Sequence, residues 1–217
     1  MTPDQAAVAR PVMVGTDGSR CSRDAIQWAA REAVRRRRPL RVVRVFDPIR
    51  TVASALDTLP PIESQRISAE TALSEAVGSV DVDVETERIM VRGNPVKELS
   101  ALSTDAETLV VGSRGLGNLA SLLLGSTSLR LAMHASCPVV VVRPQTFHGI
   151  GPSAGRVVAG VDGGRQTAQV LELAFAECDL RGSGLTAVHT YEPPDHAFSP
   201  DASPWDWPSS TSASKRS

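Results

Sequence analysis

The chain has 217 residues, of which 41% are hydrophobic but only 4% aromatic, so its core must be built mainly from aliphatic side chains. The formal net charge of −1 excludes an overall attraction to nucleic acid or an anionic membrane. No apolar stretch is long enough for a transmembrane helix, and the N-terminal residues lack the pattern of a signal peptide. Three widely spaced cysteines fit neither a zinc site nor a disulfide framework. We therefore expect a cytoplasmic protein without a membrane or nucleic-acid partner.

Strands and helices alternate from the start of the chain. A short apolar run over residues 11–19 predicts a buried strand followed by a tight loop. Apolar residues at helical spacing follow Ser22, which we expect to be the N-cap of a helix. The run at 40–46 predicts a second strand, and after a loop that ends in two prolines a second helix is expected over 63–77.

The same alternation continues to the middle of the chain. Strands are predicted at 82–91, 107–113 and 138–142, with a short helix at 96–105 and another that ends near His134. The strands are β-branched runs without clean alternation, as in strands covered on both faces. The pattern predicts a doubly wound α/β fold, an open parallel five-stranded sheet with helices on both faces. Such folds bind ligands beyond the carboxyl ends of the strands, where the strand order reverses.

An internal repeat defines the domain organisation. Residues 157–193 align without a gap on residues 12–48, with glycine, aspartate and proline at matching positions. We expect a complete domain over 10–145 and an incomplete second repeat, strand–helix–strand, over 155–194. The remaining residues, 195–217, are rich in serine and proline and predict a disordered tail.

One glycine-rich stretch needs a functional explanation. Gly112, Gly115 and Gly125 follow a predicted strand, and three hydroxyl residues come directly after them, at 126–128. Bare backbone N–H groups in front of a helix N-terminus form an anion site, which favours phosphate binding. The spacing is neither that of a Walker loop nor that of the dinucleotide fingerprint. Taken alone, the pattern also fits glycines that serve only turns and close packing.

Several spaced motifs resemble the universal stress protein (UspA-like) family. Glycine-x2-glycine-x9-glycine-serine at 112–126 is similar to the ATP-binding signature of that family. "VMVGTDGS", "WAAREA", "VRGNPVKEL" and "SCPVVVVRP" resemble its first strand, first helix, third strand with its turn, and last strand, in that order. The chain looks like a tandem-domain member of the actinobacterial type, with a second domain that is cut short.

This resemblance implies a nucleotide pocket for ATP, accompanied by Mg²⁺ or Mn²⁺ that is held through the phosphates rather than by a protein metal site. Asp17 and the two residues before it would lie near adenine and ribose, and Val45 would meet adenine through its backbone. The end of the fourth strand would lie near the ribose, and the glycine–hydroxyl stretch would hold the phosphates. The implied nucleotide-binding residues are Gly15, Thr16, Asp17, Val45, Val111, Gly112, Gly115, Gly125, Ser126 and Thr127.

The function expected from this is a stress-response regulator that binds ATP, with no catalytic residue assigned and at most slow ATP hydrolysis. One alternative is an adenine-nucleotide-dependent hydrolase or transferase, although the loop at 15–22, "GTDGSRCS", departs from the Ser-Gly-Gly-x-Asp-Ser pattern of those enzymes. Another is an interaction module that binds no nucleotide. The short apolar strand at 138–142 is expected at a sheet edge, which predicts a homo-oligomer, a dimer in the simplest case, formed through that edge.

Overall fold

A computed structural model describes most of the chain. The described residues are 9–47, 62–113, 115, 125–143 and 156–190. They belong to two compact units, one within residues 1–150 and the other within 151–217. The tail expected at 195–217 lies outside the described residues.

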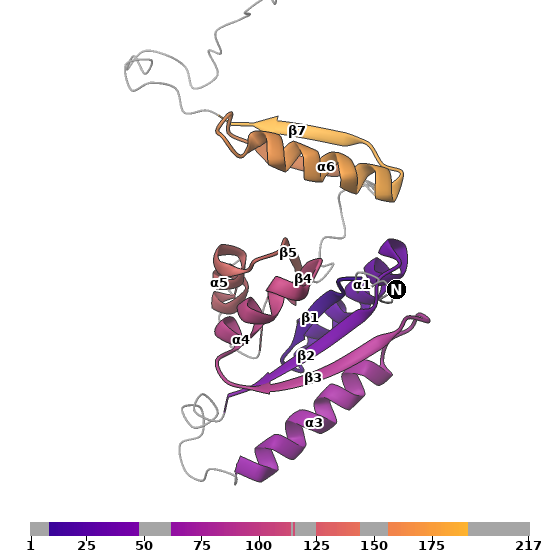
Figure 1. Cartoon of the computed structure of the whole chain (residues 1–217), viewed down its shortest axis with the longest axis vertical. Coiled ribbons are helices and arrows are strands. Elements are labelled where there is room, and N and C mark those ends of the chain that lie inside the picture. Colours follow the sequence, from indigo (N-terminus) through magenta and orange to yellow (C-terminus); the bar gives the residue numbers. More distant parts are fainter. Residues whose placement is uncertain (1–8, 48–61, 114, 116–124, 144–155, 191–217) are drawn as a thin grey trace, which may run out of the picture. The chain divides into compact units, whose positions relative to one another are not determined.

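The first unit contains a five-stranded parallel sheet (Figure 1). Its strands are β1 (Val12–Thr16), β2 (Leu40–Phe46), β3 (Thr86–Arg92), β4 (Thr108–Gly112) and β5 (Val139–Val142). They lie in the order β3-β2-β1-β4-β5, and each neighbouring pair is parallel. The sequence prediction of an open parallel sheet is therefore confirmed. The order reverses between β1 and β4, which is the position where this fold class binds ligands.

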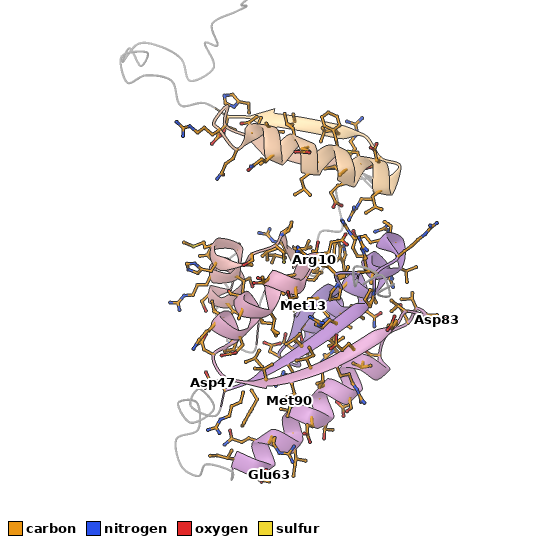
Figure 2. The ribbon with its side chains drawn as sticks, in the orientation of Figure 1. Arg10, Met13, Asp47, Glu63, Asp83 and Met90 are labelled. Carbon is orange, nitrogen blue, oxygen red and sulfur yellow. The ribbon has the colours of Figure 1, made fainter. Side chains whose placement is uncertain are left out.

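Helices cover both faces of this sheet. On one face lie α1 (Arg20–Arg36) and α3 (Ile62–Gly78), and on the other α4 (Pro95–Leu102) and α5 (Ser126–His134). A short 3-10 helix, η1 (Ser103–Asp105), follows α4. Alternate strand residues face the two cores, so that Val12 and Val14 pack on α1 whereas Met13 packs with α4 and α5. These three side chains are fully buried, and Figure 2 labels Met13.

The two ends of the sheet can be followed in Figure 2, where Asp47 comes directly after β2 and Asp83 precedes β3. The third strand begins later than the sequence predicts, at Thr86 rather than near residue 82. Thr86 pairs with Leu40, the first residue of β2, so the earlier residues have no neighbouring strand to pair with. Pro39 precedes Leu40 and lacks a backbone N–H.

The first helix begins earlier than expected, and the prediction of Ser22 as its N-cap is wrong. The N-cap is Ser19, whose side chain accepts a hydrogen bond from the Ser22 backbone N–H at 3.2 Å. Ser22 is buried inside the first turn, where its hydroxyl donates to the Ser19 carbonyl at 2.9 Å. The hydroxyl of Ser22 therefore serves the loop before the helix.

The basic run that ends α1 is held by two carboxylates. Glu32 is fully buried, and its oxygens lie 2.6 Å from Arg35 Nη1 and 2.7 Å from Arg36 Nε. Glu107 accepts from Arg36 at 3.2 Å and from Arg38 at 2.5 Å. These ion pairs hold Arg35, Arg36 and Arg38 within the fold.

The second unit contains β6 (Val157–Val161), α6 (Thr167–Arg181) and β7 (Leu185–His189), in the strand–helix–strand order that the repeat predicts. The two strands are parallel, and Val157 pairs with Leu185 as Val12 pairs with Leu40 in the first unit. No helix in the described part of the chain is long and apolar enough to cross a membrane.

Candidate nucleotide-binding site

The candidate site lies where β1 and β4 end. The two strands are neighbours and parallel, and Val14 of β1 pairs with Val110 of β4. Their carboxyl ends therefore bring the loop after Thr16 close to the turn that begins at Gly112. Both segments were expected to contribute to one crevice, and both lie at the point where the strand order reverses.

The loop after β1 is fixed by its own hydrogen bonds. Asp17 Oδ1 accepts from the Ser19 N–H at 2.9 Å, and Thr16 Oγ1 accepts from the Gly18 N–H at 3.2 Å. The Thr16 hydroxyl also donates to Ser22 Oγ at 3.1 Å. Gly18 has a φ of +81°, which residues with a side chain rarely adopt. The Thr16 side chain is thus used to hold the loop and is buried.

Close packing explains two of the predicted glycines. A Cβ atom on Gly112 would lie 2.8 Å from the carbonyl carbon and oxygen of Cys21, so the end of β4 packs directly on the backbone of α1. A Cβ on Gly15 would lie 3.0 Å from Leu99 Cδ1 and 3.6 Å from Val111 Cγ1. Glycine at these positions allows strand and helix to approach closely, in addition to any role toward a ligand.

The two ends of the glycine turn are tied together. The backbone N–H of Gly125 donates to the Ser113 carbonyl at 2.7 Å, and Ser113 N–H donates to Val142 at 2.8 Å. Ser128 Oγ donates to the Gly112 carbonyl at 2.9 Å, and this side chain is buried. The start of α5 is therefore attached to the end of β4, with the remainder of the turn between them.

The N-terminus of α5 provides donors for an anion. The N-cap is Gly125, which has no side chain to accept hydrogen bonds from the first turn. Ser126, the first helical residue, is exposed, and Thr127 is half-buried. The first N–H groups of a helix have no partner within the helix, and the helix dipole favours negative charge there. This end of α5 can therefore hold a phosphate.

Gly115 connects the two halves of the candidate site. A Cβ atom built on Gly115 would lie 2.5 Å from Asp17 Oδ2, the carboxylate oxygen at the end of the β1 loop. The structure thus places the middle glycine of the turn directly against the aspartate that the resemblance assigns to the pocket. Because Gly115 lacks a side chain, its backbone can approach both that carboxylate and a ligand.

Val45 lies somewhat apart from these residues. It is near the end of β2, one strand beyond β1, and its half-buried side chain packs into the core on the α4 side of the sheet. Its backbone lies at the carboxyl end of the strand, as expected, while its side chain serves the core.

Sequence reasoning missed Ser113 and Arg44, and it assigned Ser22 a different role, the N-cap of α1. Ser113 gave no signal because it acts through its backbone N–H and carbonyl. Arg44 Nη1 donates to the Thr16 carbonyl at 3.3 Å. Burial lowers the pKa of its guanidinium below the ordinary value, and the negative charge of Asp17 acts in the opposite direction. The repeat alignment, which pairs Arg44 with His189, could have drawn attention to it.

Among the described residues, no group of three or more histidine, cysteine, aspartate or glutamate side chains could hold a metal ion. In this part of the chain the glycine turn has the carboxylate of Asp17 beside it. A single carboxylate supplies few of the oxygen ligands that a divalent cation prefers.

The sequence profile of the Universal stress protein family matches residues 9–143, which include the whole candidate site. The chain belongs to the universal stress protein family. It is 39% identical to the universal stress protein Rv3134c of Mycobacterium tuberculosis over 195 residues, which cover 86% of this chain and 68% of that protein. This universal stress protein spans between 63% and 68% of the length of the mycobacterial relatives that it matches.

Solved structures share its architecture. The crystal structure of a universal stress protein from Archaeoglobus fulgidus is 20% identical, has a TM-score of 0.61, and covers 85% of this chain and 69% of its own. A second universal stress protein, solved in complex with cAMP, is 28% identical over 63% of this chain and 98% of its own, with a TM-score of 0.42. The first of these supports the α/β fold of the present universal stress protein.

Proposed function

We propose that the first unit binds ATP together with Mg²⁺ or Mn²⁺ and that the protein acts in the cytoplasm as a stress-response regulator. The observation that carries this proposal is the N-terminus of α5, where Gly125 is the N-cap and Ser126 and Thr127 follow. Gly125 donates to the Ser113 carbonyl, two residues before Gly115, which itself lies against Asp17. Membership of the universal stress protein family and the glycine spacing 112–115–125 support a nucleotide as the ligand.

The chemistry of the described residues supports regulation rather than efficient catalysis. A general base for hydrolysis must reach a water molecule beside the terminal phosphate. The carboxylate beside the turn is that of Asp17, whose Oδ1 already accepts from the Ser19 N–H. Hydrolysis is therefore expected to be slow at most, and the bound nucleotide would act by stabilising the unit that holds it.

The test is calorimetry of ATP with Mg²⁺ on the full chain, beside Gly115→Val. A side chain at Gly115 would displace the Asp17 carboxylate, the end of a flexible side chain, so the fold should persist while the turn is filled. Gly78→Val is the matched control, because a Cβ at Gly78 meets nothing within 4 Å. One nucleotide bound per chain, lost only in the Gly115 variant, is expected. Absence of binding by the folded wild type would leave an interaction module as the better explanation.

We also propose that two copies associate through β5. It is the last strand in the sheet and pairs with β4 on one side. The unpaired backbone groups of a short apolar edge strand favour pairing with another chain. Leu129 and Met133 of α5, the helix that precedes β5 in the chain, are 50% and 69% exposed. Sedimentation at micromolar concentration should show a dimer. A monomer across that range would contradict this assembly.

A further inference from the structure

Arg44 lies directly behind the loop that carries Asp17. It is near the end of β2, and its Cα partner in β1 is Thr16. Its Nη1 donates to the Thr16 carbonyl at 3.3 Å and lies 3.5 Å from the place a Cβ would occupy on Gly18. The guanidinium thus donates to the backbone directly before Asp17 and lies close to Gly18, the residue after it.

Burial at this position raises the free energy of the charged Arg44 side chain. The guanidinium is partly buried, and among the described residues its buried Nε has no hydrogen-bond partner. Burying a charge costs free energy unless nearby groups compensate for it. The Thr16 carbonyl and the negative charge of Asp17 are the compensation that the described residues provide. An apolar side chain at such a strand position would avoid this desolvation cost, so the presence of a charge calls for a functional explanation.

The second repeat has a corresponding contact, made by a histidine in place of the arginine. His189 is the counterpart of Arg44, and its Nδ1 lies 2.8 Å from the carbonyl oxygen of Val161, the counterpart of Thr16. The loop beyond it is also retained, since Asp162 Oδ1 accepts from Gly164 N–H at 2.8 Å. Both repeats therefore place a basic side chain of the second strand on the last carbonyl of the first strand.

The charge of Asp17 explains what Arg44 would contribute. The resemblance implied that Asp17 lies near adenine and ribose, but its carboxylate lies against Gly115, in the turn proposed to hold phosphates. An uncompensated carboxylate there would repel a polyphosphate. We propose that Arg44 is a positioning residue of the nucleotide site: it fixes the β1 loop through the Thr16 carbonyl and offsets the charge of Asp17 beside the phosphates. This inference rests on the proposed function.

The test compares AMP, ADP and ATP, each with Mg²⁺, by calorimetry on the full chain. Arg44→Met is expected to weaken ATP binding about tenfold, ADP less, and AMP least, because the repulsion grows with the number of phosphates. Arg44→Lys restores the charge and should recover part of the loss. Arg41→Met is the matched control: Arg41 is on the same strand, but its Nε pairs with Glu87 at 2.7 Å, away from the loop. Its affinities should equal those of the wild type.

A second variant separates charge from structure. Adding Asp17→Asn to Arg44→Met removes the carboxylate that Arg44 offsets, so the double variant should regain the graded part of the ATP loss. Unchanged affinities in Arg44→Met, or an equal loss for all three nucleotides without recovery in the double variant, would overturn the inference while leaving nucleotide binding intact. A folded wild type that binds none of the three would overturn the proposed function as well.

Discussion

Three adjacent hydroxyl residues at the start of α5 are expected to have different roles, and substituting them one at a time tests this. Ser128 is buried, and its Oγ donates to the Gly112 carbonyl at 2.9 Å. Ser126, two residues earlier, is exposed at the first position of the helix. Ser128→Ala should therefore lower the stability of the first unit, whereas Ser126→Ala should leave stability unchanged and weaken phosphate binding.

The size of the effect follows from the hydrogen bond at Ser128. Removing a partner from a buried polar group costs about 1–3 kcal/mol. Alanine has a higher helix propensity than serine, which returns roughly 0.5 kcal/mol within a helix. We expect Ser128→Ala to lower the free energy of unfolding by about 1–2 kcal/mol. Ser126→Ala loses no hydrogen bond that holds α5 to β4, so its change should stay within about 0.5 kcal/mol.

Urea unfolding of the full chain, followed by circular dichroism, measures this difference through the midpoint and slope of the transition. Ligand-free protein must be used, since bound nucleotide would itself raise stability. Equal stabilities of the two alanine variants would refute the reasoning, because the bond between α5 and β4 would then contribute nothing. A larger loss at Ser126 than at Ser128 would refute it equally.

Three further predictions use other contacts of the fold. Gly15→Ala should lower the free energy of unfolding by about 1–2 kcal/mol, because its Cβ would lie 3.0 Å from Leu99 Cδ1. Gly160→Ala, at the matching position of the second repeat, should be neutral because a Cβ there meets nothing within 4 Å. Equal changes for the two variants in urea unfolding would contradict this. Glu32→Gln should cost about 2 kcal/mol, since it removes the buried negative charge that pairs with Arg35 and Arg36. An unchanged urea midpoint would argue against the network. Burial raises the pKa of the Cys137 thiol, so its alkylation should have its pH midpoint at a higher pH in the native chain than in urea. Peptide mass spectrometry measures the extent of alkylation at each pH. Equal midpoints would show that the thiol is not desolvated.

The fold could be predicted from the sequence because its strands are unusually clear. The run at 40–46 is bounded by Pro39 and Asp47, and β2 occupies those residues without change. The start of β3 could not be read in the same way. Val82 and Val84 are apolar and pack against the core. They precede Thr86, the residue that pairs with the first residue of β2, so no residue of β2 lies opposite them. Only the strand register reveals this.

The sequence indicates which residues form the candidate site better than it indicates their contacts. The glycines at 112, 115 and 125 are visible because glycine is costly and its spacing is regular. The contacts of Ser113 and Arg44 depend on which backbone carbonyl lies near them, and no sequence pattern specifies that. The N-cap of α1 was missed for the same reason, since Ser19 and Ser22 are both suitable and the loop geometry decides between them.

The adjacency of β1 and β4 has a consequence for how the protein is made. The two strands are neighbours in the sheet, yet α1, β2, α3, β3, α4 and η1 separate them along the chain. Contacts between distant segments form late and slowly in folding. During synthesis, a nascent chain that has left the ribosome only as far as β3 lacks β4 and the start of α5. Nucleotide could then stabilise the newly made protein only after α5 has emerged. A bound ligand would therefore stabilise the complete first unit and not the folding intermediates that precede it.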